Sequence, residues 1–187
     1  MLTIEHLNCG YGKHEILHDI SVTIPDKKIT AIVGQSGCGK TTFLKMISGL
    51  SKPTDGEIQM FGYRNEELKN VRSRISCLIE APGIYGNMSA YHNLAIKCRL
   101  FGINDSKYIE KILKSVGLSE VGKKKTKHFS LGMKQRLGIG LALVGEPDLL
   151  VLDEPINGLD PQGMAEIRDM LLRLKEEQNM TIIISSH

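Results

Sequence analysis

Residues 34–42 read GQSGCGKTT and match the phosphate-loop pattern G-x-x-x-x-G-K-[S/T] at every fixed position. The glycines allow consecutive backbone N–H groups to curl around an anion, and a helix that begins here adds partial positive charge. Lys40 is expected to reach the β- and γ-phosphates, and the Thr41 hydroxyl to bind Mg²⁺. A glycine-rich turn without a ligand is the alternative, but the complete motif between a strand and a helix favours a phosphate site. The residues expected to contact nucleotide are Gly34, Gln35, Ser36, Gly37, Cys38, Gly39, Lys40, Thr41 and Thr42.

Two adjacent carboxylates could supply the acidic side of such a site. Residues 149–155 read LLVLDEP, so four apolar residues lead directly to Asp153 and Glu154. Asp153 could hold the metal through water, and Glu154 could polarise the attacking water. Paired carboxylates also occur in solvated loops. Here they follow a buried strand in a chain with a phosphate loop, which favours the catalytic interpretation.

A third carboxylate, Glu80, ends the apolar stretch ISCLIEAP at residues 75–82. A short apolar run bounded by proline is typical of a buried strand. A glutamate at the end of such a strand could be an exposed side chain or part of a site. The local pattern leaves both interpretations open.

Strands are expected to deliver these groups. Alternating or continuous apolar runs predict them at residues 2–7, 16–24, 28–33, 57–61, 75–79, 149–152 and 181–184, and CGYGKHE at 9–15 is expected to be a turn. The last two strands are unbroken apolar runs, which is typical of parallel strands covered on both faces.

Helices are expected at residues 41–50 and 161–175, and again between about 88 and 143, where the pattern becomes helical. Ser89, either Asn104 or Asp105, and Ser130 are candidate N-caps for three helices in that stretch. The sequence therefore predicts an α/β core that is interrupted by a helical insertion at about residues 88–145.

Composition excludes several other classes of protein. The 187 residues are 41% hydrophobic and 24% charged, as in globular proteins, and a net charge of +3 with no Trp gives no sign of a nucleic-acid partner. The four cysteines form no C-x-x-C pair, which argues against a zinc site and a disulfide framework. The longest mostly apolar stretch, residues 137–144, is too short to span a bilayer, so we expect a cytoplasmic polypeptide.

Four further motifs carry a family resemblance. GYGK occurs at residues 10–13, FSLGMKQRL at 129–137, NGLD at 157–160 and IIISSH at 182–187. With the phosphate loop and LLVLDEP, they resemble the ordered motifs of an ATP-binding cassette (ABC) ATPase across the whole chain. The resemblance implies the α/β P-loop NTPase (RecA-like) fold, with an antiparallel β subdomain and an inserted helical subdomain.

The resemblance also implies a domain organisation. Residues 1–87 would form the β subdomain and the part of the core with the Walker A motif, and residues 88–145 the helical subdomain with the signature motif. Residues 146–187 would form the core with the Walker B motif, the D-loop and the H-loop. Since family members continue beyond the H-loop histidine, the chain is expected to lack a C-terminal part.

By the same resemblance, Tyr11 stacks on adenine, Asp160 closes the D-loop and His187 contacts the γ-phosphate. Ser130, Gly132 and Met133 fall in the signature, which binds the γ-phosphate held by the opposite subunit. This signature differs from the commoner Leu-Ser-Gly-Gly-Gln, because Phe, Leu and Met replace its Leu, first Gly and Gln. Ser130 and Gly132 retain the hydroxyl and the unhindered backbone that suit a helix N-terminus approaching phosphate.

Glu80 falls where the family usually has glutamine. CLIEAP followed by SLGMKQRL resembles the bacitracin-export and lantibiotic-immunity branch, and this implies that Glu80 is a Mg²⁺ ligand with Thr41 and Asp153. The implied function is ATP binding and hydrolysis, with Glu154, His187 and Lys40 as catalytic residues, in an exporter of peptide antibiotics. The implied partners are a second ABC subunit in a head-to-tail dimer and transmembrane permease subunits at the inner face of the cell membrane.

Two other functions stay open at the level of sequence. One is a soluble ABC ATPase that acts on nucleic acid or ribosomes, although such proteins usually carry a coiled-coil insertion or two cassettes in one chain. The other is a truncated nucleotide-binding module without turnover.

Overall fold

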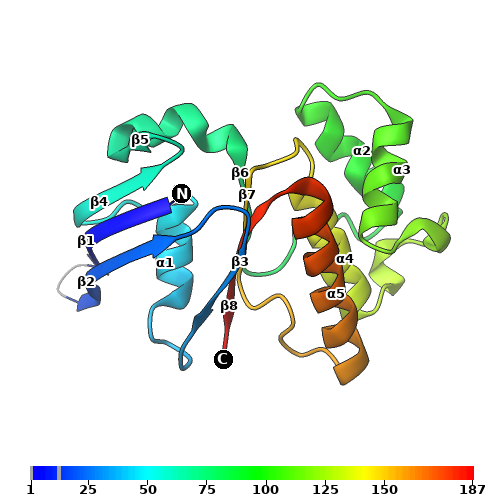
Figure 1. The fold of residues 1–187 in the computed structure, drawn as a ribbon. Helices are drawn as coiled ribbons and strands as arrows, with labels where there is room; N and C mark the ends of the chain where they lie inside the picture. The colour runs from blue at the N-terminus through cyan, green and yellow to red at the C-terminus, as the bar shows by residue number, and fades with distance from the viewer. Residues whose placement is uncertain (1, 12–13) are drawn as a thin grey trace.

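The computed structural model describes residues 2–11 and 14–187, which form two β-sheets and a group of helices. Figure 1 shows the antiparallel sheet on one side, the parallel sheet in the middle and most helices on the other side. The antiparallel sheet has the order β2-β1-β4-β5 and comprises β1 (Leu2–Tyr11), β2 (His14–Ile24), β4 (Asp55–Met60) and β5 (Tyr63–Arg64). The parallel sheet has the order β3-β8-β7-β6 and comprises β3 (Ile29–Val33), β8 (Thr181–Ser186), β7 (Leu149–Leu152) and β6 (Ile75–Leu78).

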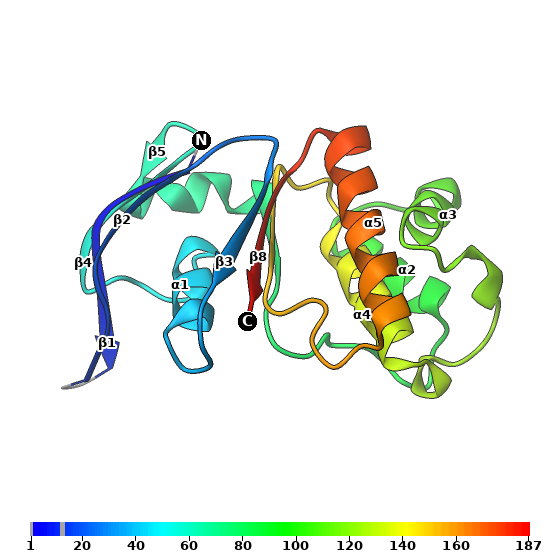
Figure 2. The same ribbon diagram turned by 60° about the horizontal axis from the view of Figure 1, so that its bottom comes forward.

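The helix α1 (Lys40–Ile47) lies between the two sheets in both ribbon views (Figures 1 and 2). Its buried residues Phe43, Leu44 and Ile47 share one core cluster with side chains from both sheets. Along β7, successive side chains point to opposite faces, so Leu149 and Val151 join this cluster whereas Leu150 and Leu152 join the second one. This two-sided burial explains why the sequence of β7 is apolar without interruption.

The second core cluster lies between the parallel sheet and α2 (Ala90–Leu100), α3 (Ser106–Ser115), α4 (Leu131–Ala142) and α5 (Pro161–Gln178). Ser89, Asp105 and Ser130 cap α2, α3 and α4, because each side chain accepts a hydrogen bond from a backbone N–H in the first turn. The predicted caps are therefore confirmed, with Asp105 chosen over Asn104. Each such cap typically contributes about 1 kcal/mol.

The structure differs from the sequence-based expectation in several elements. In the predicted turn at residues 9–15, residues 9–11 belong to β1 and residues 14–15 to β2, whereas residues 12–13 lie outside the described part of the structure. A 3₁₀ helix, η1 (Asn65–Arg74), was not predicted because only Val71 in it is fully buried, which leaves no apolar periodicity. Two shorter 3₁₀ helices, η2 (Ser119–Val121) and η3 (Thr126–His128), precede α4. The domain boundaries at residues 88 and 145 stay predictions.

Candidate nucleotide-phosphate site

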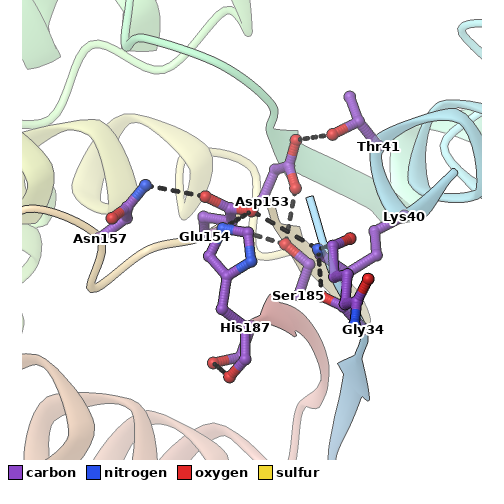
Figure 3. Close-up of polar contacts among 10 residues, drawn as sticks. Gly34, Lys40, Thr41, Asp153, Glu154, Asn157, Ser185 and His187 are labelled. Atoms are coloured by element: carbon purple, nitrogen blue, oxygen red, sulfur yellow. Dashed lines mark hydrogen bonds and ion pairs between the residues drawn. The ribbon is translucent and has the colours of Figure 1, made fainter. Parts of the chain in front are cut away.

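The candidate site lies where β3, β7 and β8 end. The parallel pairing sets Leu152 beside Ile184 and Ala31 beside Ile184, so the residues that follow these strands emerge at the same edge of the sheet. Figure 3 shows the result: Gly34 and Lys40 approach Asp153, Glu154 and His187 from the side of the phosphate loop. Crevices at the carboxyl ends of parallel strands are where α/β proteins bind ligands.

The phosphate loop joins β3 to α1, and its glycines are required by its shape. Gly37 and Gly39 have φ values of 80° and 96°, which L side chains rarely adopt. A Cβ atom added at Gly39 would also lie 2.8 Å from Leu17 Cδ2. Lys40, which is 7% exposed, donates hydrogen bonds from Nζ to the carbonyl oxygens of Gly34 (2.6 Å) and Gln35 (3.0 Å).

Two oxygen-bearing side chains from opposite sides of the site meet directly. Thr41 Oγ1 donates a hydrogen bond of 2.7 Å to Asp153 Oδ2, which joins the start of α1 to the end of β7. Mg²⁺ prefers oxygen ligands and usually takes only one or two from a protein, with waters and substrate phosphates supplying the rest. The Thr41–Asp153 pair fits that requirement, although no group of three or more His, Cys, Asp or Glu suited to a metal occurs among the described residues.

The carboxylate of Glu154 is contacted on both oxygens. Oε1 lies 2.8 Å from His187 Nε2 and 3.8 Å from Lys40 Nζ, and Oε2 accepts a hydrogen bond of 2.8 Å from Asn157 Nδ2 (Figure 3). The backbone of Glu154 has φ 47°, so the chain turns sharply after β7. The structure thus brings together the three residues that were predicted to be catalytic.

Other predicted site residues lie elsewhere. Ser130 begins α4, and the signature packs on the segment before α5: a Cβ added at Gly158 would meet Leu131 Cδ2 at 3.4 Å, and one at Gly132 would meet Leu159 Cδ2 at 3.7 Å. Met133 donates its backbone N–H to Ser130 Oγ. Asp160 caps α5 by accepting a hydrogen bond from the Gly163 N–H. The side chain of Tyr11 lies outside the described part of the structure.

Glu80 follows β6 at the neighbouring strand end, with φ 67°. Its Oε1 accepts a hydrogen bond of 2.8 Å from Lys45 Nζ, and its side chain is 70% exposed. In this arrangement the carboxylate is paired with a cation from α1 rather than with Thr41 or Asp153. Its assignment as a Mg²⁺ ligand stays a prediction.

Sequence reasoning missed Ser185 and Asn157. Ser185 Oγ donates to Asp153 Oδ1 at 2.6 Å and accepts from the Glu154 N–H at 2.7 Å. A signal existed for Ser185, since it follows an apolar strand run as Asp153 does, and parallel neighbours end at the same edge. Asn157 is the first residue of the NGLD motif, in which only Asp160 had been given a role.

Comparison with known proteins identifies the family of the chain. The family profile described as "ABC transporter" matches residues 17–157. The chain is 44% identical over its full length to the bacitracin transport ATP-binding protein BcrA of Enterococcus faecalis and spans 61% of that protein. It is 43% identical over its full length to the lantibiotic transport ATP-binding protein SrtF of Streptococcus pyogenes and spans 80% of it.

Solved structures show the same fold. CbiO1 from Clostridium perfringens, part of the ABC transporter complex cbiONQ, superposes with a TM-score of 0.87 at 31% identity, covering 100% of this chain and 78% of that one. The ATP-binding cassette MJ0796, a dimer bound to ADP and Pi in a post-hydrolysis state, gives 0.84 at 25% identity, covering 100% and 88%.

The fold and the phosphate-loop motif define a P-loop NTPase with a RecA-like core, as the family resemblance implied. Within that class the chain belongs to the ABC transporter family and contains its ATPase domain. Among the described helices, none has both the length and the apolar character that crossing a membrane demands.

Proposed function

We propose that the chain is the ATP-hydrolysing part of an exporter that removes peptide antibiotics of the bacitracin or lantibiotic type. The observation that carries this proposal is the similarity of about 43% over the whole chain to two transport ATP-binding proteins named for such antibiotics. The arrangement of Lys40, Thr41, Asp153, Glu154 and His187 at one sheet edge supports the hydrolytic part.

Different residues of the chain would have different roles in hydrolysis. Lys40 can exchange its two carbonyl acceptors for phosphate oxygens, and Thr41 with Asp153 would hold Mg²⁺. When bound, that ion neutralises charge on the β- and γ-phosphates. Glu154 would orient a water and accept its proton while the water oxygen bonds to the γ-phosphorus and the bond to the β–γ bridging oxygen breaks. His187 and Asn157 would keep the two oxygens of Glu154 in place.

The proposed working form is a head-to-tail pair of ABC subunits bound to transmembrane permease subunits at the cytoplasmic face of the membrane. The placement of Ser130, Gly132 and Met133 at the start of α4 supports the pairing, since a helix N-terminus attracts phosphate. CbiO1 comes from a transporter complex and MJ0796 forms a dimer, which also supports it. Nucleic acid is not among the proposed partners.

A deletion of the gene in its host tests the proposal. Complementation with the wild-type gene should restore resistance to bacitracin or a lantibiotic, whereas the Glu154→Gln gene should not. The purified Glu154→Gln protein should hydrolyse ATP at least about 100-fold more slowly while still binding it, since it loses its general base. An antibiotic of another chemical class provides the control.

Unchanged sensitivity of the deletion strain to both peptide classes would refute the export function. Full ATPase activity in the Glu154→Gln protein would instead refute the role of Glu154.

A further inference from the structure

Ser185 is a buried side chain that contacts both acidic residues at the end of β7. Its exposed fraction is 0%. Its hydroxyl donates a hydrogen bond of 2.6 Å to Asp153 Oδ1 and accepts one of 2.7 Å from the Glu154 N–H. Figure 3 shows Ser185 between these residues and the phosphate loop. The hydroxyl group can make both bonds at once, because it donates its single hydrogen to Asp153 and accepts the Glu154 N–H with a lone pair.

The register of the parallel sheet fixes this position. Leu152 is paired with Ile184, so the next residues on the two strands, Asp153 and Ser185, emerge side by side. Asp153 is fixed further by its backbone N–H, which donates to the Leu78 carbonyl of β6 at 2.9 Å. The side chain of Ser185 is therefore held by the core of the sheet, not by a loop.

The two contacts of Ser185 act on different parts of the site. The bond to Oδ1 orients the Asp153 carboxylate so that its other oxygen, Oδ2, meets Thr41 Oγ1 at 2.7 Å. The bond to the Glu154 N–H secures a backbone with φ 47°, a conformation that residues other than glycine seldom adopt. From that turn the Glu154 carboxylate reaches His187 Nε2.

We propose that Ser185 is a positioning residue for MgATP hydrolysis, which couples the orientation of the Asp153 carboxylate to that of Glu154. The inference rests on the proposed function. Ser185 would touch neither nucleotide nor metal, and it acts by holding the Asp153 carboxylate and the backbone turn from which the Glu154 carboxylate extends. Partners of metal ligands typically change metal affinity or activity by about 10–100-fold when they are removed.

The chain offers a matched control in the same strand. Thr181, at the opposite end of β8, is also buried, and its Oγ1 accepts a hydrogen bond of 2.8 Å from the N–H of Lys27, another residue with positive φ. Thr181→Val removes a hydroxyl bond of the same kind far from the phosphate loop. Ser185→Ala and Thr181→Val should therefore lower thermal stability similarly but differ in function.

The experiment uses the full purified chain. The Mg²⁺ dependence of binding to a fluorescent ATP analogue is measured by titration with MgCl₂, and kcat and KM are measured for ATP. Ser185→Ala should raise the half-saturating Mg²⁺ concentration about tenfold and lower kcat about 10- to 100-fold, with KM within about twofold. Thr181→Val should leave all three unchanged. Ser185→Thr, which retains the hydroxyl, should recover most of kcat.

Two results would overturn the proposal. One is an Mg²⁺ requirement and a kcat that do not change in Ser185→Ala, and the other is an equal loss in Ser185→Ala and Thr181→Val, which would mark a purely structural role. If the wild-type chain binds MgATP without hydrolysing it, the proposed function fails in its hydrolytic part. The Mg²⁺ titration then still decides whether Ser185 orients Asp153, because it needs no turnover.

Discussion

Cys38 places an exposed thiol in the middle of the phosphate loop. Its Sγ lies over Gly34, where an added Cβ would come within 2.7 Å of it. Cys9 and Cys98 are buried and Cys77 is partly buried, and burial raises the pKa of the Cys77 and Cys98 thiols. Since the thiolate is the reactive form, an alkylating reagent should reach Cys38 first.

We expect a maleimide to label Cys38 and block nucleotide binding, and MgATP to slow the labelling. Mass spectrometry of tryptic peptides gives the rate at each cysteine with and without MgATP. Cys38→Ser is the control and should bind nucleotide after the same treatment. Labelling at equal rates with and without MgATP would show that nucleotide does not cover this part of the loop.

Glu80 leads to a second prediction at the residue scale. A carboxylate binds Mg²⁺ more strongly than an amide oxygen does, although it adds negative charge near the phosphates. With the ion bound, its charge is the largest in the site and the attraction should prevail. Glu80→Gln should keep ATPase activity within about tenfold, or about 1.4 kcal/mol of barrier, and need more Mg²⁺. Glu80→Ala should lose more activity.

These variants should be compared in the assembled transporter. The segment that contains Glu80 connects β6 to α2 and is expected to couple ATP hydrolysis to transport as well. An Mg²⁺ requirement that is unchanged in both variants would mean that Glu80 is only the exposed partner of Lys45.

Candidate site residues could be predicted where a local sequence motif determines their position. Contacts between residues that are far apart in sequence could not be predicted. Lys40 and Thr41 could be named as candidates because the loop motif fixes their spacing, and Asp153 because a buried strand leads to it. The Lys45–Glu80 pair joins residues 35 positions apart, and the contacts of Ser185 with Asp153 depend on which strand lies next to β7. No local pattern contains that information.

At the scale of elements, helix starts were the most predictable feature, because a capping side chain and the helix it starts are neighbours in sequence. Strand ends in the antiparallel sheet were less predictable. β1 has register shifts against β2, and the two strands reach into the predicted turn as far as Tyr11 and His14. His6 and Asp19 lie at such irregularities, with φ values of 49° and 47°.

The His6–Asp19 pair gives this pair of strands a pH dependence. His6 Nδ1 lies 2.6 Å from Asp19 Oδ1, and this hydrogen bond, with the charge of the carboxylate, raises the pKa of His6 above its ordinary value. Protonated His6 thus favours the folded state. Its contribution is complete below the unfolded pKa of about 6.5 and is lost as the pH rises through the higher folded value.

We expect Asp19→Asn to return the pKa of His6 towards its ordinary value, as followed by NMR titration of the imidazole resonances. The effect on stability should be small, because both side chains are exposed. The other histidines provide the internal control. A His6 titration that is identical in wild type and Asp19→Asn would show that the pair does not form in solution.

At the scale of the whole molecule, the fold class was predictable from the unbroken apolar runs of β7 and β8, which require cover on both faces. The strand order β3-β8-β7-β6 could not be predicted, because it depends on how the connections between the strands pack against the sheet. The phosphate loop precedes α1 and the signature begins α4, an arrangement that fits the proposed head-to-tail pairing of two subunits.

A gel-filtration experiment tests the pairing. Glu154→Gln with MgATP should elute as a dimer, because nucleotide is bound but not hydrolysed, and Lys40→Ala should remain a monomer because it lacks the cation that binds phosphate. The wild-type protein with ADP is the control. Elution of Glu154→Gln only as a monomer would contradict the dimer.

The hydrogen bonds that Lys40 makes within the phosphate loop affect the interpretation of a measured ATP affinity. Its ammonium already donates to the Gly34 and Gln35 carbonyl oxygens, so nucleotide entry is a substitution and not an addition. A measured dissociation constant therefore reports the difference between phosphate contacts and contacts within the loop, and the binding enthalpy is reduced by the bonds that are broken. These hydrogen bonds of Lys40 within the loop can give a strong phosphate site a moderate measured affinity.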